Sequence, residues 1–393
     1  MNNINSETLL NPVSFSSAIL NSLPTDGGLY IPSHFPRPPV LDSQPFAQYA
    51  DQLIKGFIQA DHYFQQATTL FSTSIDFSPT ISKLNSEHHL LELFHGPSLS
   101  FKDFGAHFLA ECLHHIPHKK HRLIMVATSG DTGSAVAAAF YQKPNTNVVI
   151  LYPQHGVSAR QAQQLGCWGE NITTLAIDND FDTCQTLVKT ALADSDLSQA
   201  FEITTANSIN IGRLLAQVAY YAYSSATYHN QHQQAANIIV PSGNLGNVTA
   251  CCWAKAMGSP INHIVIAQNA NKTVVDYCQT GSMIARPTIQ TLANAMDVGS
   301  PSNFKRLQSL YPNHQQFCES LHAYSVSDDK IKDCILQTHD DSGVIICPHT
   351  ATAVSLLPQL QPMAPHWLIA ATAHPGKFEN IIEPLINKTI DLP

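Results

Sequence analysis

The sequence contains few charged residues. Asp, Glu, Lys and Arg make up only 12% of its 393 residues, whereas soluble domains typically carry about 25%. Lys and Arg together number 20, histidines also number 20, and the formal net charge is −9. Such a chain lacks the basic surplus that neutralises nucleic-acid phosphates. Because 44% of the residues are hydrophobic, disorder is also disfavoured. We expect a folded protein that binds no nucleic acid.

Targeting signals and cross-linking patterns are also missing. No Lys or Arg precedes Arg37, although secretory leaders and transit peptides need basic residues near the start. No apolar run reaches the roughly 18 residues of a membrane-spanning helix. The nine cysteines are irregularly spaced and include no C-x-x-C pair, which is typical of reduced, mostly buried thiols. We expect a cytoplasmic protein that does not enter a membrane.

Several catalytic motifs are absent. No two glycines are spaced G-x-G, so the dinucleotide-binding fingerprint is excluded. The chain also lacks the G-x-S-x-G elbow of hydrolases and the H-E-x-x-H motif of zinc proteases. A group of four histidines does not have zinc-site spacing, and we interpret it as surface: His114, His115, His118 and His121. We predict no metal site.

Strand-like and helix-like segments alternate along most of the chain. The predicted strands are 91–94, 123–127, 148–152, 173–177, 238–241, 264–267, 344–346 and 367–371. The predicted helices are 46–71, 101–113, 132–141, 158–165, 181–193, 248–257 and 350–360. This alternation indicates parallel sheets covered by helices, and the length suggests roughly two to three domains. We predict an α/β fold with two parallel-sheet domains and a mixed helical N-terminal region.

One lysine has an unusual position. Lys102 lies in or just before the first turn of a predicted helix, between Phe101 and Phe104. Both the helix dipole and apolar surroundings lower the pKa of a lysine amine, and Schiff-base chemistry needs a neutral amine. Alternatively, the ammonium could snorkel from the helix start into water. The local pattern leaves both interpretations open.

Three loops that follow predicted strands could bind a ligand. The first reads Thr128-Ser129-Gly130-Asp131-Thr132 and could bind an anion or only cap a helix. The second reads Ser242-Gly243-Asn244-Leu245-Gly246-Asn247, and its N–H groups could converge on a phosphate. No Lys-Ser/Thr pair follows, so it suits a small phosphorylated cofactor and not a nucleotide P-loop. The third contains Thr372, whose hydroxyl could face a ligand or only close a turn.

Arg213 is isolated in the sequence. It is the only Asp, Glu, Lys or Arg residue between Glu202 and Lys255, and it opens a predicted helix with Leu214 and Leu215. Because the helix dipole disfavours a cation there, its partner should be an anion from elsewhere. A distant carboxylate and a ligand phosphate are both possible partners, and an arginine suits bidentate phosphate recognition.

Together these motifs resemble the threonine synthase family of pyridoxal-phosphate enzymes, in particular its bacterial short-form branch. The family has the tryptophan-synthase-β-like fold, known as fold type II. The resemblance runs from Phe15 to Leu392. It is carried by the segments Asp26-Gly27-Gly28-Leu29, Phe101-Lys102-Asp103-Phe104, Ser129-Gly130-Asp131-Thr132-Gly133, Leu151-Tyr152-Pro153, Asn207-Ser208-Ile209-Asn210, Pro241-Ser242-Gly243-Asn244, Ala295-Met296-Asp297-Val298, Pro348-His349-Thr350-Ala351 and Thr372-Ala373-His374-Pro375.

The resemblance implies an activity and a cofactor. The enzyme would convert O-phospho-L-homoserine and water to L-threonine and phosphate, by elimination and hydration that depend on pyridoxal phosphate. Lys102 would hold the cofactor covalently and act as the catalytic base, Asp131 would approach the ring hydroxyl, and Thr372 would face the pyridine nitrogen. The cofactor phosphate would be cradled by the backbone N–H groups of Gly243, Asn244, Leu245, Gly246 and Asn247. Two of these depart from the family pattern, since we expect Phe at position 245 and often Asp at position 247.

The resemblance also implies substrate contacts and a domain arrangement. The substrate carboxylate would meet Thr128, Ser129, Asp131 and Thr132, and the substrate phosphate would meet Ser158, Asn207, Asn210 and Arg213. A large cofactor domain would comprise 86–100 and 215–393, a smaller domain 101–214 would carry the substrate loop, and 1–85 would form an N-terminal region. The protein would act as a monomer or homodimer.

Two other functions remain open from the sequence. One is another fold-type II lyase, such as a serine/threonine dehydratase or a phospholyase on a related γ-phosphorylated amino acid. The other is a non-catalytic binding protein on the same scaffold, which the presence of Lys102 and of the phosphate loop disfavours.

Overall fold

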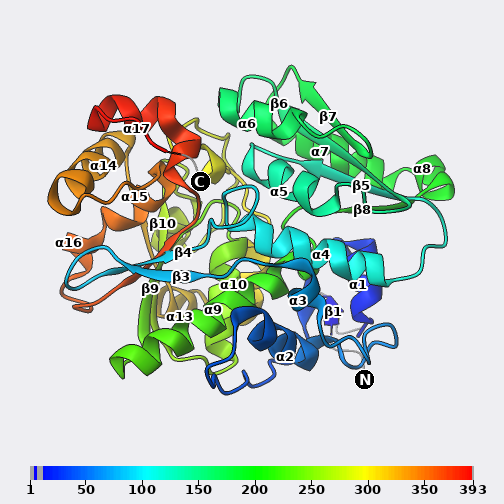
Figure 1. Ribbon diagram of the computed structural model, residues 1–393, viewed down its shortest axis with the longest axis horizontal. Helices are drawn as coiled ribbons and strands as arrows, with labels where there is room; N and C mark the ends of the chain where they lie inside the picture. The colour runs from blue at the N-terminus through cyan, green and yellow to red at the C-terminus, as the bar shows by residue number, and fades with distance from the viewer. Residues whose placement is uncertain (1–3, 7–11, 392–393) are drawn as a thin grey trace. The chain divides into compact units, whose positions relative to one another are not determined.

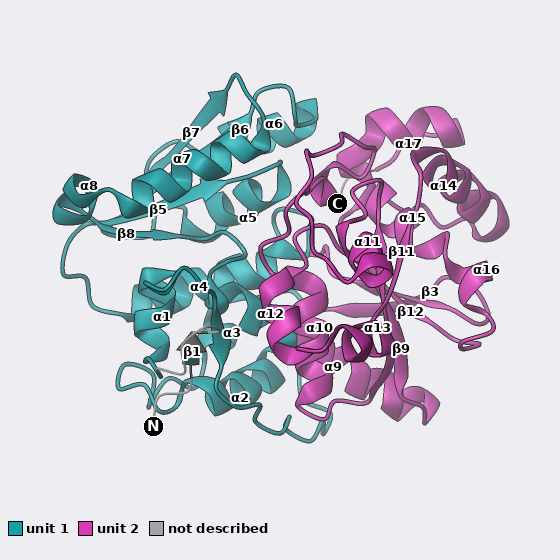
Figure 2. Cartoon of the chain, turned by 180° about the vertical axis from the view of Figure 1, so that it is seen from behind, with its two compact units in different colours: residues 1–77, 96–219 teal, residues 78–95, 220–393 magenta. Residues whose placement is uncertain are grey.

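The chain divides into two compact units. The computed structural model describes residues 4–6 and 12–391 (Figure 1). Unit 1 comprises 1–77 and 96–219, and unit 2 comprises 78–95 and 220–393 (Figure 2). The helix α9 (Ile211–His232) runs from one unit into the other.

Unit 1 contains a parallel sheet and a mixed N-terminal part. Its elements are β1 (Ile4–Ser6), α1 (Phe15–Asn21), β2 (Tyr30–Pro32), α2 (Phe46–Ile58), α3 (Leu70–Ser74), α4 (Lys102–His115), β5 (Arg122–Ala127), α5 (Asp131–Phe140), β6 (Thr146–Pro153), α6 (Ala159–Gly166), β7 (Ile172–Ile177), α7 (Phe181–Ala193), α8 (Ser195–Ala200) and β8 (Glu202–Thr205). The sheet has the order β7-β6-β5-β8, with all neighbours parallel. A separate antiparallel pair joins β1 to β2.

Helices cover both faces of the unit 1 sheet. On β6, Val149 and Leu151 belong to the apolar cluster of Cys184 and Val188 from α7. Ile150 lies between them in sequence, and a Cβ on Gly133 of α5 would approach its side chain within 2.9 Å. Since successive strand residues point to opposite faces, α5 and α7 lie on opposite sides of the sheet. Both strand and helix assignments in this region confirm the alternation predicted from sequence.

The predicted helix 46–71 is wrong in its second half. The structure ends α2 at Ile58 and begins α3 only at Leu70. Asp61 lies in the interruption, where its carboxylate accepts the N–H groups of Tyr63 (3.0 Å) and Ser16 (2.6 Å). An acidic side chain that binds nearby N–H groups competes with the helix. Because Ser16 is distant in the sequence, the helical pattern alone could not place this break.

Unit 2 contains a larger mixed sheet. Its elements are β3 (Thr80–Lys83), β4 (His89–Glu92), β9 (Ala236–Pro241), α10 (Gly246–Ala256), β10 (Ile261–Gln268), α11 (Thr273–Thr280), η1 (Asn294–Met296), α12 (Phe304–Leu310), α13 (His314–Ser320), β11 (His322–Ser325), α14 (Asp328–Ser342), α15 (Pro348–Val354), α16 (Leu357–Leu360), β12 (Leu368–Ala371), η2 (Pro375–Phe378) and α17 (Glu379–Ile386), together with most of α9. The order is β11-β10-β9-β12-β4-β3, and only β3 is antiparallel to its neighbour. Two parallel-sheet units thus confirm the predicted fold class.

Two predicted elements near the C-terminus of unit 2 are wrong. The segment 344–346 forms no strand. Its apolar side chains pack in the unit 2 core, but its backbone does not pair with a neighbouring strand. The predicted helix 350–360 is two helices, because α15 ends at Val354 and α16 begins at Leu357. Pro358 lies in the first turn of α16, and a proline has no N–H with which to continue the helix before it.

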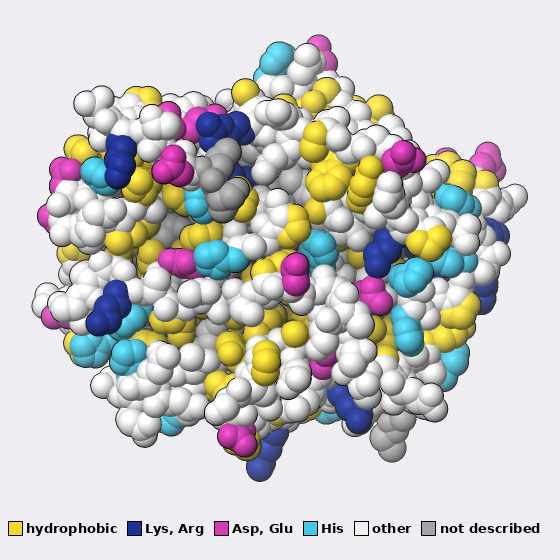
Figure 3. All heavy atoms as spheres, viewed as in Figure 1, with side chains coloured by type: hydrophobic (Ala, Val, Ile, Leu, Met, Phe, Trp, Pro, Cys, Tyr) yellow, Lys and Arg dark blue, Asp and Glu magenta, His cyan; other side chains and the backbone are white. Residues whose placement is uncertain are grey.

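The surface reflects the scarcity of charge. On the face drawn in Figure 3, Lys, Arg, Asp and Glu side chains are scattered among neutral ones. His114, His115 and His121 are exposed and His118 is partly exposed, in agreement with the surface interpretation. Six of the nine free cysteines are buried. Among the described residues, no helix has the length and hydropathy needed to cross a membrane.

We expect His107 of α4 to make the stability of the fold depend on pH. It is partly buried, and its ring lies 5.9 Å from that of Phe77. Burial and, to a smaller extent, the charge of Lys143 lower the pKa of His107 to about 4. Below its usual pKa of 6.5, the unfolded chain therefore takes up a proton that the folded chain does not. As the pH is lowered from 6.5 to about 4, the free energy of unfolding should therefore decrease by up to about 3 kcal/mol.

Urea unfolding across this pH range measures the effect. The variant His107→Gln should lose less stability than the wild type as the pH falls. The matched control is His114→Gln, which changes an exposed histidine of the same helix and should follow the wild-type curve. Parallel curves for the wild type and His107→Gln would contradict the prediction.

Candidate active site

The loop before α4 places Lys102 at the helix start. Asp103 is fully buried, and its Oδ2 accepts the N–H of Ser98 at 2.9 Å. The backbone at Gly96 passes so close that a Cβ there would lie 2.6 Å from the same oxygen. Leu99 turns the chain with a positive φ of 56°. An acidic residue in the first turn also stabilises a helix. The loop is therefore folded onto Asp103, which makes Lys102 the first residue of α4, as predicted.

Lys102 is buried next to a carboxylate. The residue is only 9% exposed, so the snorkelling alternative does not hold. Its Nζ lies 3.9 Å from Asp131 Oδ2 and 5.8 Å from the centroid of the Phe101 ring. The first separation suits an ion pair but exceeds a hydrogen bond. Since the helix dipole opposes a cation at this end, the Asp131 carboxylate offsets part of the cost of burying the amine.

The loop between β5 and α5 is held by its first residue. Thr128 Oγ1 accepts the N–H groups of Gly130 (3.0 Å) and Gly133 (2.9 Å). Gly130 has a φ of 127°, a conformation that residues with a side chain rarely adopt. Asp131 begins α5 and is buried, whereas Ser129 and Thr132 are partly exposed. The two partly exposed hydroxyls are therefore the accessible ones of this loop.

The start of α6 contains a residue that the sequence analysis missed. Ser158 caps α6, and Gln161 completes a capping box with it. The Gln161 side chain is fully buried, and its Nε2 donates to Asp131 Oδ1 at 3.0 Å. The spacing Ser-x-x-Gln is a capping-box signal visible in the sequence. It indicates a helix start but not the contact with Asp131, which lies 30 residues earlier.

Two asparagines near the start of α9 bind backbone groups. Asn207 pairs with the backbone of Ala127, accepting its N–H at 3.1 Å and donating to its carbonyl at 2.6 Å. Asn210 Oδ1 accepts the N–H of Gly212 at 3.0 Å, and its Nδ2 donates to the carbonyl of Ile19 at 2.9 Å. Their amides thus fix the end of β5 and the start of α9.

Arg213 lies in the first turn of α9, as predicted. It is 2% exposed, and its Nη1 donates to the carbonyl of Ala206 at 2.9 Å. One guanidinium nitrogen is therefore directed by the backbone just before the helix. A guanidinium carries five N–H donors in a planar arrangement, and this geometry suits the recognition of an anionic ligand.

In unit 2, the loop after β9 turns sharply into α10. Leu245 has a positive φ of 61° and immediately precedes Gly246, the first residue of the helix. A Cβ on Gly243 would lie only 2.6 Å from Met296 Cα. The loop thus requires glycine at position 243 and presents the N-terminus of an eleven-residue helix, where backbone N–H groups favour an anion.

Other motifs of unit 2 hold the backbone against which this loop packs. His349 Nε2 accepts the N–H of Ala295 at 3.1 Å. Asp297 Oδ1 accepts from Asn269 Nδ2 and Thr291 Oγ1, both at 2.7 Å. These bonds hold the residues immediately before and after Met296. The segments Ala295–Val298 and Pro348–Ala351, which carry part of the family resemblance, therefore support the loop at Gly243.

Two buried polar atoms flank the loop. Within the part of the chain that the structure describes, Ser242 Oγ and Asn247 Nδ2 have no hydrogen-bond partner. The other end of the Asn247 amide is held, since its Oδ1 accepts the hydroxyls of Tyr220 (2.5 Å) and Tyr221 (2.9 Å). Buried donors without partners are costly. Together with the helix N-terminus, they fit the phosphate group of the cofactor that the resemblance implies.

Thr372 directly follows the inner strand β12 and is 5% exposed. The neighbouring strand β4 ends at Glu92, whose carboxylate binds Ser82 Oγ (2.5 Å) and His95 Nε2 (2.9 Å). Burial raises the pKa of Glu92, but these two hydrogen bonds, together with the charges of His95 and His374, outweigh it and lower the pKa overall. For His374, burial has the opposite effect and lowers the pKa, because it disfavours the charged imidazole. A hydroxyl at the carboxyl end of parallel strands is well placed for a ligand.

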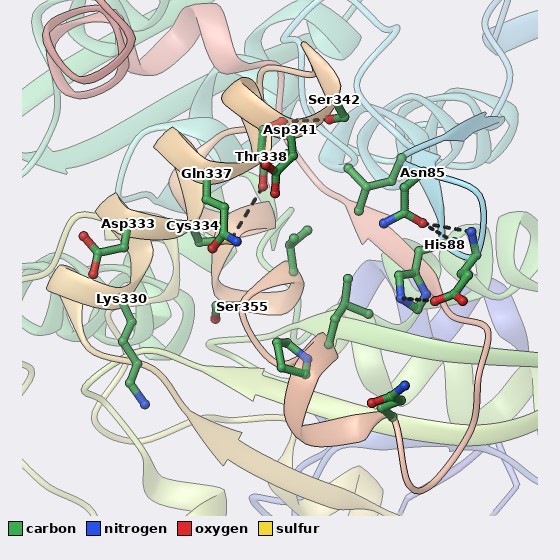
Figure 4. A pocket seen from close by; sticks show the side chains of 16 residues that line it. Asn85, His88, Lys330, Asp333, Cys334, Gln337, Thr338, Asp341, Ser342 and Ser355 are labelled. Carbon is green, nitrogen blue, oxygen red and sulfur yellow. Dashed lines mark hydrogen bonds and ion pairs between the residues drawn. The ribbon is translucent and has the colours of Figure 1, made fainter.

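A pocket elsewhere in unit 2 contains none of the predicted site residues. It has a volume of about 520 Å³ and lies among the β3–β4 connection, α14 and the α15–α16 region (Figure 4). Its charged lining residues are Lys330, Glu87, Asp333 and Asp341. Three carboxylates against one ammonium do not suit a phosphorylated ligand. Among the described residues, no three His, Cys, Asp or Glu side chains are grouped to bind a metal ion.

Known proteins similar to this chain identify its family. The family model for pyridoxal-phosphate dependent enzymes matches residues 72–365. Threonine synthase from Escherichia coli is 38% identical over 387 residues, which covers 97% of this chain and 90% of the relative. The crystal structure of the Escherichia coli threonine synthase has a TM-score of 0.90 and covers 99% of this chain and 92% of that one, at 36% identity.

A second solved structure includes the cofactor. It is the pyridoxal-phosphate-bound threonine synthase from Brucella melitensis, with a TM-score of 0.88 and 28% identity over 100% of this chain and 92% of that one. The chain therefore belongs to the pyridoxal-phosphate-dependent enzymes of fold type II and, within them, to the threonine synthase family.

Proposed function

We propose that this chain converts O-phospho-L-homoserine and water to L-threonine and phosphate, with Lys102 as the cofactor-binding residue. The observation that carries the proposal is the buried Lys102 amine at the start of α4, 3.9 Å from Asp131 Oδ2. In a chain with so few charges, a buried ammonium beside one carboxylate needs a chemical role. The similarity to threonine synthases over 97% of the chain supports the choice of reaction.

The family resemblance indicates which residues would hold pyridoxal phosphate, and their local settings are compatible with these roles. Lys102 would hold it covalently, and Asp131 would approach the ring hydroxyl. Backbone N–H groups at Gly243, Asn244, Leu245, Gly246 and Asn247 would bind its phosphate. The Thr372 hydroxyl would face the ring nitrogen and leave it less protonated than a carboxylate would. When bound, the cofactor withdraws electrons from the bonds around the substrate Cα.

The substrate residues divide into contacting and supporting groups. Ser129 and Thr132 are partly exposed, which suits contact with the substrate carboxylate. Arg213 and Ser158 would bind the substrate phosphate, whose charge grows as it leaves. Thr128, Asn207 and Asn210 use their side chains to hold backbone groups, so we propose that they support the substrate-binding loops from behind.

Lys102 would also move protons during the reaction. When its amine is free, Lys102 Nζ would take a proton from the substrate and return it. One amine can serve several transfers, because geometry selects a base before its pKa does. Asp131 would stabilise Lys102 whenever the amine is protonated.

The compartment, oligomeric state and partners of the enzyme are also part of the proposal. The substrate is a small molecule. We infer that the enzyme works in the cytoplasm as a monomer or homodimer, without nucleic acid or membrane. A net charge of −9 supplies no basic surplus for phosphates of nucleic acid or lipid.

The purified protein should release threonine and phosphate from O-phospho-L-homoserine in equal amounts. It should also show a visible absorbance that borohydride removes. Lys102→Ala should lose both, since no other amine replaces Nζ at the start of α4. Release of 2-oxobutanoate with phosphate would point to a lyase that does not add water. A coloured and active Lys102→Ala protein would rule out this lysine.

Arg213→Lys tests the proposed phosphate contact while keeping the charge. A lysine cannot reproduce the planar donors of a guanidinium, so kcat/KM for O-phospho-L-homoserine should fall by about 100-fold, the usual scale for losing one donor to a developing anion. Binding of unphosphorylated L-threonine, followed by the change in cofactor absorbance, should change little. Equal losses for both amino acids would show that Arg213 is only structural.

Gly243→Ala tests the phosphate loop. Its added Cβ would overlap the Met296 backbone, which the bonds of Ala295 and Asp297 prevent from yielding. We expect a loss of about 1–3 kcal/mol in stability and weaker binding of pyridoxal phosphate to the apoprotein, measured by absorbance titration. Gly166→Ala is the matched control, because a Cβ there meets nothing within 4 Å. Unchanged cofactor affinity in Gly243→Ala would contradict the proposed cradle.

A further inference from the structure

Gln161 connects two parts of unit 1 through one buried amide. Its Oε1 accepts the N–H of Ser158 at 3.0 Å, and its Nε2 donates to Asp131 Oδ1 at 3.0 Å. The side chain is 0% exposed. A buried amide is tolerated when its donor and its acceptor are both satisfied. Both ends of this amide are bonded, one to the cap of α6 at Ser158 and the other to Asp131 at the start of α5.

Asp131 presents its two carboxylate oxygens to different groups. Oδ1 accepts from Gln161, while Oδ2 lies 3.9 Å from Lys102 Nζ. A donor on one oxygen favours the ionised carboxylate and also limits its rotation. The orientation of Oδ2 toward the Lys102 amine therefore depends on the hydrogen bond at Oδ1.

The Gln161 amide also packs tightly against the loop that carries Asp131. A Cβ on Gly130 would lie 2.6 Å from both the amide carbon and Nε2 of Gln161. Thr128 holds the same loop from its other side, through the N–H groups of Gly130 and Gly133. Since protein interiors are close-packed, the amide cannot shift without moving the residue next to Asp131.

We infer that Gln161 is a positioning residue of this enzyme, which keeps the Asp131 carboxylate ionised and directed at Lys102. The inference rests on the proposed function, because it matters only if Lys102 carries the cofactor. The same side chain completes the cap of α6 at Ser158, a residue proposed for the substrate phosphate. Gln161 therefore links the proposed phosphate contact to the amine that performs the chemistry.

Two substitutions separate the contact with Asp131 from the cap. Gln161→Glu retains an acceptor at the third helical position, and Ser-x-x-Glu is an equally good capping box. It also replaces the Nε2 donor by an oxygen that faces Asp131 Oδ1, and two carboxylates at this separation repel each other. Gln161→Met has similar length but can neither complete the cap nor donate to Asp131.

The measurement is the pH midpoint of the visible absorbance of the purified holoenzyme, with thermal unfolding as the structural control. Gln161→Met should lower the midpoint by about half a pH unit or more, because Asp131 loses the donor that favours its charge. Gln161→Glu should raise it, since negative charge is added near Nζ. Because the two buried carboxylates repel each other, the unfolding temperature of Gln161→Glu should also fall, and the opposite directions of the two midpoint shifts distinguish an effect of charge from a loss of stability.

A double-mutant cycle decides whether Gln161 acts through Asp131. Asp131→Asn should lower the midpoint by itself, and adding Gln161→Met should lower it no further. Independent, additive shifts would overturn the inference, as would a Gln161→Met protein with the wild-type midpoint. A wild-type protein without borohydride-sensitive absorbance would instead refute the proposed function, so the two failures are distinguishable.

Discussion

The Lys102 ammonium occupies a position that both the helix dipole and burial disfavour, and much of unit 1 is arranged around it. Asp103 folds the preceding loop onto itself through Ser98 and so decides which residue begins α4. Asp131 supplies the compensating charge and begins α5. Gln161 then satisfies the remaining oxygen of Asp131 and starts α6. The starts of α5 and α6 are therefore linked by ion pairing and hydrogen bonding to the amine at the start of α4.

In unit 2, the backbone that we propose for the cofactor phosphate lies at the start of α10. The N–H groups at the start of α10 are useful only if no side chain covers them. Gly243 meets this condition because the Met296 backbone occupies the space of its Cβ. Asp297 and His349 hold Met296 in place. Segments that are far apart in the sequence therefore hold the backbone against which this short loop packs.

Local patterns predicted the elements well, and long-range contacts account for the errors. The alternation of strands and helices identified two parallel sheets, and the helix start at Lys102 followed from neighbouring residues. The break after Ile58 depends on Asp61 binding Ser16, a contact between distant segments. The apolar segment 344–346 packs in the core without pairing, and composition does not distinguish these outcomes. The role of Gln161 was missed for a related reason. Its capping signal is local, but its bond to Asp131 is not.

The starts of α6 and α9, which carry proposed site residues, are capped by neutral groups, whereas Asp180 and Asp194 cap α7 and α8. Ser158, Gln161 and Asn210 satisfy helix starts with neutral groups, although carboxylates are common in these positions. A neutral cap provides the same hydrogen bond without a long-range field, since only net charges act strongly over several ångströms in a poorly screened interior. Additional acidic caps near Lys102 or Arg213 would weaken the attraction of these cations for a substrate phosphate or carboxylate. We propose that these neutral caps leave the field around a bound substrate to a small number of charges, among them Lys102, Asp103, Asp131 and Arg213.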